Sequence, residues 1–220
     1  MRKFTILLIT AFISISVIAQ DDFDNRFYFR FGYSNPSWTQ FGFTESDWAD
    51  GVKKSGFMGE IGTIFMLNSI PMPDKMKLGI DVDYLSFYWN QFSFHENGID
   101  TDIGTMRFDS KVGPSFTYNP VSKLTFDVYV KADLSWVTAT VVVYNNDADD
   151  YDGYADGTIF GFSTGLNVRY SILMLGFEFN TINPKLENVD HDGQYIGNMN
   201  EEGDDKSPLP SMNFTLGLNF

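Results

Sequence analysis

The sequence predicts an all-β fold: a closed antiparallel up-and-down β-barrel that crosses a membrane with about eight strands, ten being the alternative. Three observations predict it. Apolar and polar residues alternate with a period of two over about eight segments, which is the pattern of strands with one apolar and one polar face. The connections between these segments are mostly long and short in turn, as in membrane barrels. The apolar positions are rich in large rings, and the chain has 22 Phe and 11 Tyr.

The first nineteen residues are expected to be a cleaved signal peptide, which leaves 20–220 as one barrel domain. Arg2 and Lys3 precede an apolar run that ends on Ala19, and this run is shorter than the roughly 20 residues of a membrane-spanning helix. The chain has no cysteine, which excludes disulfides, thiolate metal sites and a lipidated cysteine anchor. Its formal net charge of −14 opposes nucleic-acid binding.

The strands are expected where the alternation is found. In order, the runs are Phe27 to Tyr33, Phe57 to Phe65, Leu78 to Tyr84, Met106 to Tyr118, Leu124 to Trp136, Phe160 to Tyr170, Leu173 to Asn180 and Met212 to Phe220. Long polar connections are expected at 34–54, 90–102, 137–157 and 183–208, an intermediate one at 67–77, and tight turns at 119–122 and at Ser171. Long loops on one side and short turns on the other predict termini on the periplasmic side.

The apolar side of each strand is expected to contact lipid, because its Phe, Tyr and Trp side chains would overfill the interior of an eight-stranded barrel. The opposite side is rich in Gly, Ser, Thr and Asn and carries charges of both signs. Buried charge is tolerated when it is paired. We therefore expect ion pairs across the lumen among Arg30, Glu60, Asp81, Asp83, Arg107, Asp109, Lys111, Asp127, Lys131, Asp133, Arg169 and Glu178.

The final segment, Met212-Asn-Phe-Thr-Leu-Gly-Leu-Asn-Phe220, alternates without a break. With the export signal, the strand pattern and the loop lengths, it makes the chain resemble the small outer-membrane β-barrels of the OmpA/OmpX/OmpW type, without an appended periplasmic domain. The resemblance implies the outer membrane of a Gram-negative bacterium, contact with lipid and lipopolysaccharide, and long loops at the cell surface. It also implies that the outer-membrane assembly machinery reads Phe214, Leu216, Leu218 and Phe220.

An acidic segment is a candidate metal site. Asp147, Asp149 and Asp152, followed by Gly153, offer alternate carboxylates in a stretch without Lys or Arg, and calcium prefers several oxygen ligands. The spacing is not that of an EF-hand and no Glu closes it, so a solvated acidic loop is the alternative. No other cofactor is expected.

Two further loop features suggest function. His95 and His191 are the only histidines; each lies beside an acidic residue, but no nucleophile motif such as G-x-S-x-G is present. Aromatic residues between Trp38 and Trp48 are interleaved with acids, which suits either a binding surface for protein or glycan or an interfacial belt.

The expected function is that of a small outer-membrane barrel with a structural, adhesive or accessory-subunit role, in the last case within a larger outer-membrane complex. The alternative is a narrow channel or a hydrophobic-solute carrier, which the charged inward positions oppose. A third possibility, a lipid A-modifying enzyme, requires His95 or His191 beside a serine and a carboxylate near the membrane surface.

Overall fold

The computed structural model of this protein describes residues 23–36, 53–96, 99–145, 151–182, 187–189, 195–198 and 210–220. The expected signal peptide lies outside these residues. Among the described residues, no helix is long and apolar enough to cross a membrane.

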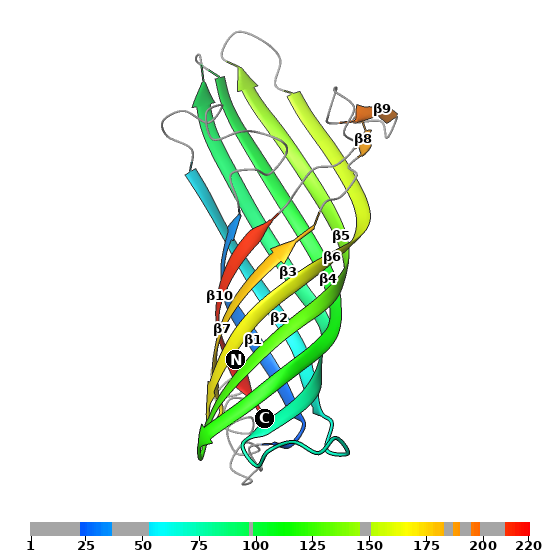
Figure 1. Ribbon diagram of the computed structural model, residues 1–220. Coiled ribbons are helices and arrows are strands. Elements are labelled where there is room, and N and C mark those ends of the chain that lie inside the picture. Colours follow the sequence, from blue (N-terminus) through cyan, green and yellow to red (C-terminus); the bar gives the residue numbers. More distant parts are fainter. Residues whose placement is uncertain are drawn as a thin grey trace, which may run out of the picture.

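Eight strands form a closed antiparallel ring, which Figure 1 shows as a tilted cylinder. The order around the ring is β5-β4-β3-β2-β1-β10-β7-β6, and the pairing of β5 with β6 closes it. These strands are β1 (Arg26–Pro36), β2 (Lys53–Met66), β3 (Met76–Glu96), β4 (Ile99–Val121), β5 (Leu124–Asn145), β6 (Tyr151–Tyr170), β7 (Leu173–Thr181) and β10 (Ser211–Asn219). Two short strands, β8 (Glu187–Val189) and β9 (Tyr195–Asn198), add a small pair to β6. The predicted closed barrel with eight strands is confirmed.

The tight turns, the start of β1 and the end of β10 lie at one end of the cylinder, here called the turn end. The backbone groups of Phe27 and Phe220 hydrogen-bond to each other there, at 2.8 and 3.1 Å. Two tight turns place non-glycine residues in the left-handed region, Lys123 with φ 69° and Ser171 with φ 56°. Tight turns at this end leave the opposite end, here called the distal end, for the longer connections.

The outer face of the barrel is apolar. Burial alternates along the strands: in β10 every second residue is exposed, and the exposed ones are Met212, Phe214, Leu216 and Leu218. The same alternation leaves large apolar side chains exposed on all eight strands of the ring. An exposed apolar surface that encircles the molecule is suited to hydrocarbon and not to water. The placement of the large rings on the outside is as the sequence predicts.

Aromatic rings form a girdle on the distal side of this apolar surface. Neighbouring rings are in contact from β1 to β5, with centroids 5.1 to 6.0 Å apart, and again between β7 and β10. The girdle consists of Phe31, Phe57, Phe87, Trp89, Phe108, Trp136, Phe177 and Phe214. Aromatic girdles lie at the interfaces of membrane barrels, so this one marks where the strands leave the hydrocarbon.

The apolar band has the thickness of a membrane. Along β2 it runs from Phe57 to Phe65, and along β5 from Phe126 to Trp136. These lengths match the roughly 9 to 11 residues that a tilted strand needs to cross the hydrocarbon core.

Four strands continue well beyond the girdle. β3, β4, β5 and β6 have 21, 23, 22 and 20 residues, whereas β1, β2, β7 and β10 have 11, 14, 9 and 9. Figure 1 shows these four long strands rising together above the rest of the ring. We call the part of β3 to β6 on the distal side of the girdle the wall. The expected long loops at 90–102 and 137–157 are therefore wrong in extent, because most of their residues lie in paired strands. The Val- and Thr-rich run from Val137 explains part of the difference, since β-branched residues favour strands.

Strand β3 has a β-bulge near the middle of the described β2–β3–β4 sheet. The register shifts between Asp83 and Ser86, so Tyr84 and Leu85 both lie on the outer face. The Tyr84 hydroxyl donates to Thr63 Oγ1 at 3.1 Å, and the Ser110 hydroxyl donates to the Tyr84 carbonyl oxygen at 2.9 Å. These bonds satisfy polar groups that lipid cannot satisfy.

Candidate functional site

The centre of the lumen holds a network of buried charges. Arg30 on β1 and Glu60 on β2 are register partners, and their side chains are completely buried. The guanidinium Nη2 of Arg30 lies 2.5 Å from Glu60 Oε1, and its Nε donates to the same oxygen at 2.6 Å. Strand alternation alone directs both side chains inward.

The network crosses the lumen to the opposite side of the ring. Lys111 Nζ on β4 lies 2.6 Å from Glu178 Oε1 on β7 and 3.4 Å from Glu60 Oε2. Arg30 Nη2 reaches Glu178 Oε2 at 3.2 Å. Two cations and two carboxylates from four strands therefore share their charges, which is the condition under which buried ions are tolerated.

A second part of the network joins β5 to β3. Lys131 Nζ lies 3.0 Å from Asp81 Oδ2 and 2.8 Å from Asp83 Oδ2. Lys111 Nζ connects the two parts, since it lies 3.9 Å from Asp83 Oδ2. All of these side chains are fully buried.

Three inward tyrosines complete the network. Tyr88 and Tyr129 each donate a hydrogen bond to Glu178 at 2.9 Å. Lys111 donates to the Tyr88 oxygen at 2.5 Å and Arg30 to the Tyr129 oxygen at 3.1 Å. Tyr28 contacts both Asp81 and Asp83. The sequence pattern predicts no role for these tyrosines, although the alternation directs Tyr28 and Tyr129 to the same face as Arg30 and Lys131.

Two of these tyrosines lie over glycines. A Cβ added at Gly62 would overlap the Tyr28 side chain and lie 2.6 Å from the Val82 carbonyl oxygen. A Cβ at Gly165 would meet Tyr129 in the same way, and its backbone neighbour would be the Phe177 carbonyl oxygen at 2.6 Å. Each tyrosine extends over the neighbouring strand to a carboxylate on the strand after it, because the neighbouring strand has no side chain at the paired position.

The remaining charges lie nearer the two ends. Arg169 pairs with Asp127 at 2.6 Å, and Arg107 with Asp109 at 2.9 Å. Asp133 accepts a hydrogen bond from Ser163. All twelve charged residues named from the sequence are buried in the barrel, and eleven of them lie within ion-pair distance of an opposite charge. Arg26 is also buried and was not among the twelve.

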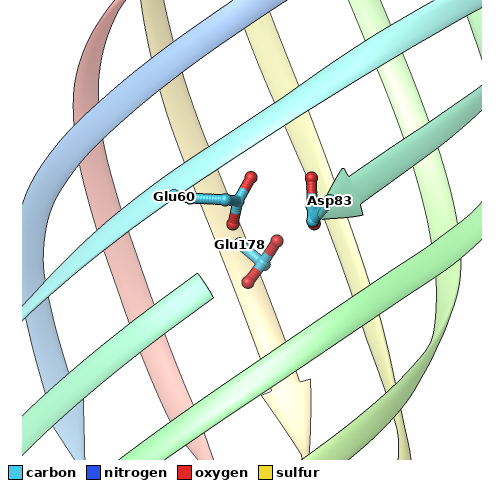
Figure 2. Close-up of side chains that lie close together, drawn as sticks. All are labelled: Glu60, Asp83 and Glu178. Carbon is cyan, nitrogen blue, oxygen red and sulfur yellow. The ribbon is translucent and has the colours of Figure 1, made fainter. Parts of the chain in front are cut away.

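Figure 2 shows three carboxylates of the network close together, Glu60, Asp83 and Glu178. Each offers an oxygen within 4.8 Å of the others, a spacing that a metal ion could bridge. Arg30, Lys111 and Lys131, however, already occupy these oxygens. A cation added here would have to displace an ammonium or guanidinium group, so the cluster belongs to an ion-pair network and not to a metal centre.

Other residues predicted as sites are not described. Asp147 and Asp149 lie outside the described residues, as do the side chains of Asp152 and His95, His191, and the aromatic segment from Trp38 to Trp48. The calcium loop, the histidine sites and the aromatic binding surface stay predictions.

The terminal strand has the geometry that the alternation predicts. Phe214, Leu216 and Leu218 point outward and are exposed, while Asn213 and Asn219 are buried. β10 pairs with β1 on one side and β7 on the other, so the first and the last strands of the ring lie side by side. Its recognition by the assembly machinery stays a prediction.

No family model matches the chain, and no curated protein sequence matches it. It is similar to a solved major outer membrane protein of Thermus thermophilus, with 8% identity over 89% of this chain and 99% of that one and a TM-score of 0.48. A second is Ail, the attachment invasion locus protein of Yersinia pestis, solved with the heparin analogue sucrose octasulfate. It has 13% identity over 90% of this chain and 99% of that one, with a TM-score of 0.46. A third is OprG of Pseudomonas aeruginosa, with 12% identity over 90% of this chain and 96% of that one and a TM-score of 0.37. The predicted resemblance to small outer-membrane barrels is confirmed as one of fold, which the closed eight-stranded ring itself displays.

Proposed function

We propose that this protein is a closed, non-conducting barrel of a Gram-negative outer membrane that carries the wall at the cell surface, with a structural, adhesive or accessory-subunit role. The observation that carries the proposal is the filled lumen. Buried ion pairs join β1, β2, β4 and β7 across its centre, and an ion would have to break them to pass. The channel alternative is therefore not favoured.

The wall is the second support. About half of the residues of β3 to β6 suffice to cross the hydrocarbon, yet these strands have 20 to 23 residues. The excess is paired strand and not loop, which gives a stiff surface beyond the girdle. Such a surface suits a protein or glycan partner better than a substrate that must pass through the barrel.

Conductance tests the closed lumen. The refolded protein in a planar lipid bilayer is expected to produce no discrete conductance steps. The Glu178→Ala/Lys111→Ala double variant, which removes the pair that crosses the lumen, serves as the positive comparison. Regular steps from the wild-type protein would contradict the proposal.

Labelling tests the orientation of the wall. The chain has no cysteine, so single cysteines can be placed at will. Thr140→Cys, an exposed position on the wall, is expected to react with a membrane-impermeant maleimide on intact cells. Ser122→Cys, an exposed position in a tight turn, is expected to react only after lysis. The reverse pattern would place the wall in the periplasm and end the surface role.

A wall deletion tests the surface role itself. Replacing 138–156 by a two-residue turn shortens β5 and β6 to the girdle and leaves the ion-pair network in place. The shortened barrel is expected to keep heat-modifiable gel mobility and to lose attachment of cells to host matrix, or co-purification of outer-membrane partners. If both are retained, the role does not lie in the wall.

A further inference from the structure

The three lumen tyrosines differ in what surrounds their hydroxyl groups. The hydroxyls of Tyr88 and Tyr129 each contact one cation and one carboxylate. A tyrosine hydroxyl has one proton to donate and lone pairs with which to accept. In both cases the cation donates to the oxygen and the hydroxyl proton goes to Glu178, so every contact contains one proton.

Tyr28 lacks this balance. Its hydroxyl oxygen lies 2.7 Å from Asp81 Oδ1 and also contacts Asp83 Oδ1. Lys131 Nζ lies 3.3 Å away as a donor. Ionised carboxylates only accept, so the single hydroxyl proton can serve one of the two carboxylate contacts. The other contact would join two oxygens with no proton between them.

The charges of the central network show the same shortage. It has four carboxyl groups, Glu60, Asp81, Asp83 and Glu178, and three cations, Arg30, Lys111 and Lys131. All are fully buried. One fully ionised carboxylate therefore has no counter-charge of its own, and an unpaired buried charge is heavily penalised.

We propose that the Asp83 carboxyl group, which contacts Tyr28 and lies among the other carboxylates of the network, holds one proton and is a carboxylic acid in the folded barrel at neutral pH. The extra proton supplies the missing hydrogen bond to Tyr28 and the missing positive charge in one step. A metal ion is the poorer answer, because Lys131 already occupies the oxygens that would bind it.

The surroundings of the unit of Asp81, Tyr28 and Asp83 are defined on each strand that packs against it. The ionisable and charged groups that face it include Arg30 on β1, Glu60 on β2, Lys111 on β4, Lys131 and Tyr129 on β5, and Glu178 on β7. Deprotonation would leave two neighbouring carboxylates sharing Lys131. With the proton bound, the folded barrel holds one more proton than the unfolded chain at neutral pH, and folding is therefore favoured by lower pH over this range.

Infrared spectroscopy of the refolded protein in lipid vesicles tests the proposal directly. At pH 7 the wild-type barrel is expected to show the carbonyl stretch of a protonated carboxyl group, shifted in D2O. Asp81→Asn and Asp83→Asn are each expected to abolish it, because an Asn amide can donate to Tyr28 without an added proton. Asp127→Asn is the matched control: its carboxylate pairs with Arg169, so the band is expected to persist.

A second measurement begins with the wild-type protein. The urea midpoint of wild-type protein is expected to fall as the pH rises above 7, with the folding equilibrium constant dropping by up to about tenfold per pH unit for one proton. Asp83→Asn is expected to flatten this profile. Absence of the carboxylic acid band in the wild type, or a band that survives in Asp83→Asn, would overturn the proposal.

Discussion

The two faces of one strand show the logic of this barrel. On β5, Val128 and Val130 point outward and are 50% and 51% exposed, while Tyr129 and Lys131 between and beside them point inward and are 1% and 0% exposed. A water-soluble barrel would place the valines inside. The difference teaches that the outer face, within the described apolar band, carries no charged side chain, whereas the inner face carries charges most of which lie in ion pairs.

The largest effect is expected from removing one partner of an inner pair. Arg169→Met leaves the buried Asp127 carboxylate without its guanidinium, and breaking a buried pair costs about 3–5 kcal/mol. Urea unfolding in lipid vesicles measures the loss. The double variant Arg169→Met/Asp127→Leu is expected to recover much of it, because replacing both partners removes the unpaired charge. A double variant as unstable as the single one would mean that packing and not charge sets the cost.

A charge on the outer face is expected to come next. Val130→Arg places a guanidinium near the middle of the apolar band and is expected to cost about 2–4 kcal/mol in the same unfolding experiment. Val121→Arg is the matched control at the turn end, where the cost falls to about 0–1 kcal/mol. Equal losses of stability at the two depths would show that the cost of the charge does not come from the membrane.

A smaller effect is expected from filling the glycines beneath the tyrosines. Gly165→Ala forces its new Cβ against Tyr129 and the Phe177 carbonyl oxygen, and overpacking costs about 1–3 kcal/mol. Gly59→Ala is the control, since its nearest neighbour would be Phe31 Cδ2 at an ordinary 3.5 Å. A harmless Gly165→Ala would show that the tyrosine can move without loss.

The smallest effect is expected at a turn. Lys123 has φ 69°, a conformation that costs a non-glycine residue roughly 1–2 kcal/mol. Lys123→Gly removes that cost but adds chain entropy to the unfolded state, about 0.5–1 kcal/mol. A net gain between zero and about 1.5 kcal/mol is expected from the urea midpoint. Ser122→Gly, which has no such strain to relieve, is expected to lose stability.

The fold could be predicted because alternate residues of a membrane strand lie on opposite faces, one in contact with lipid and the other in the lumen. The alternation in Leu124 to Trp136 gives the direction of every side chain, and the sizes of the rings decide which face meets lipid. Inward placement of Arg30, Lys131 and Glu178 follows from the same register without knowledge of any partner.

The ion-pair partners in the lumen and the lengths of the strands could not be predicted. Arg30 and Glu178 are 148 residues apart in the chain, and their contact depends on the tilt of the strands and the stagger of the ring. The bulge at Tyr84 breaks the alternation locally, so the run appeared to end there. The wall was expected to be loop because many of its residues on β3, β4 and β6 are polar, and polarity there reflects water beyond the girdle and not the absence of pairing. The two carboxyl groups around Tyr28 lie 53 and 55 residues from it.

The wall also has a mechanical consequence. Its strands are the same strands that cross the hydrocarbon, and the ladder between β4 and β5 continues from Val121 and Leu124 to Ile99 and Asn145. A load applied at its tip would pass as shear along many hydrogen bonds in parallel, with no flexible tether to stretch first. A force on the tip of the wall therefore acts on the whole cylinder at once.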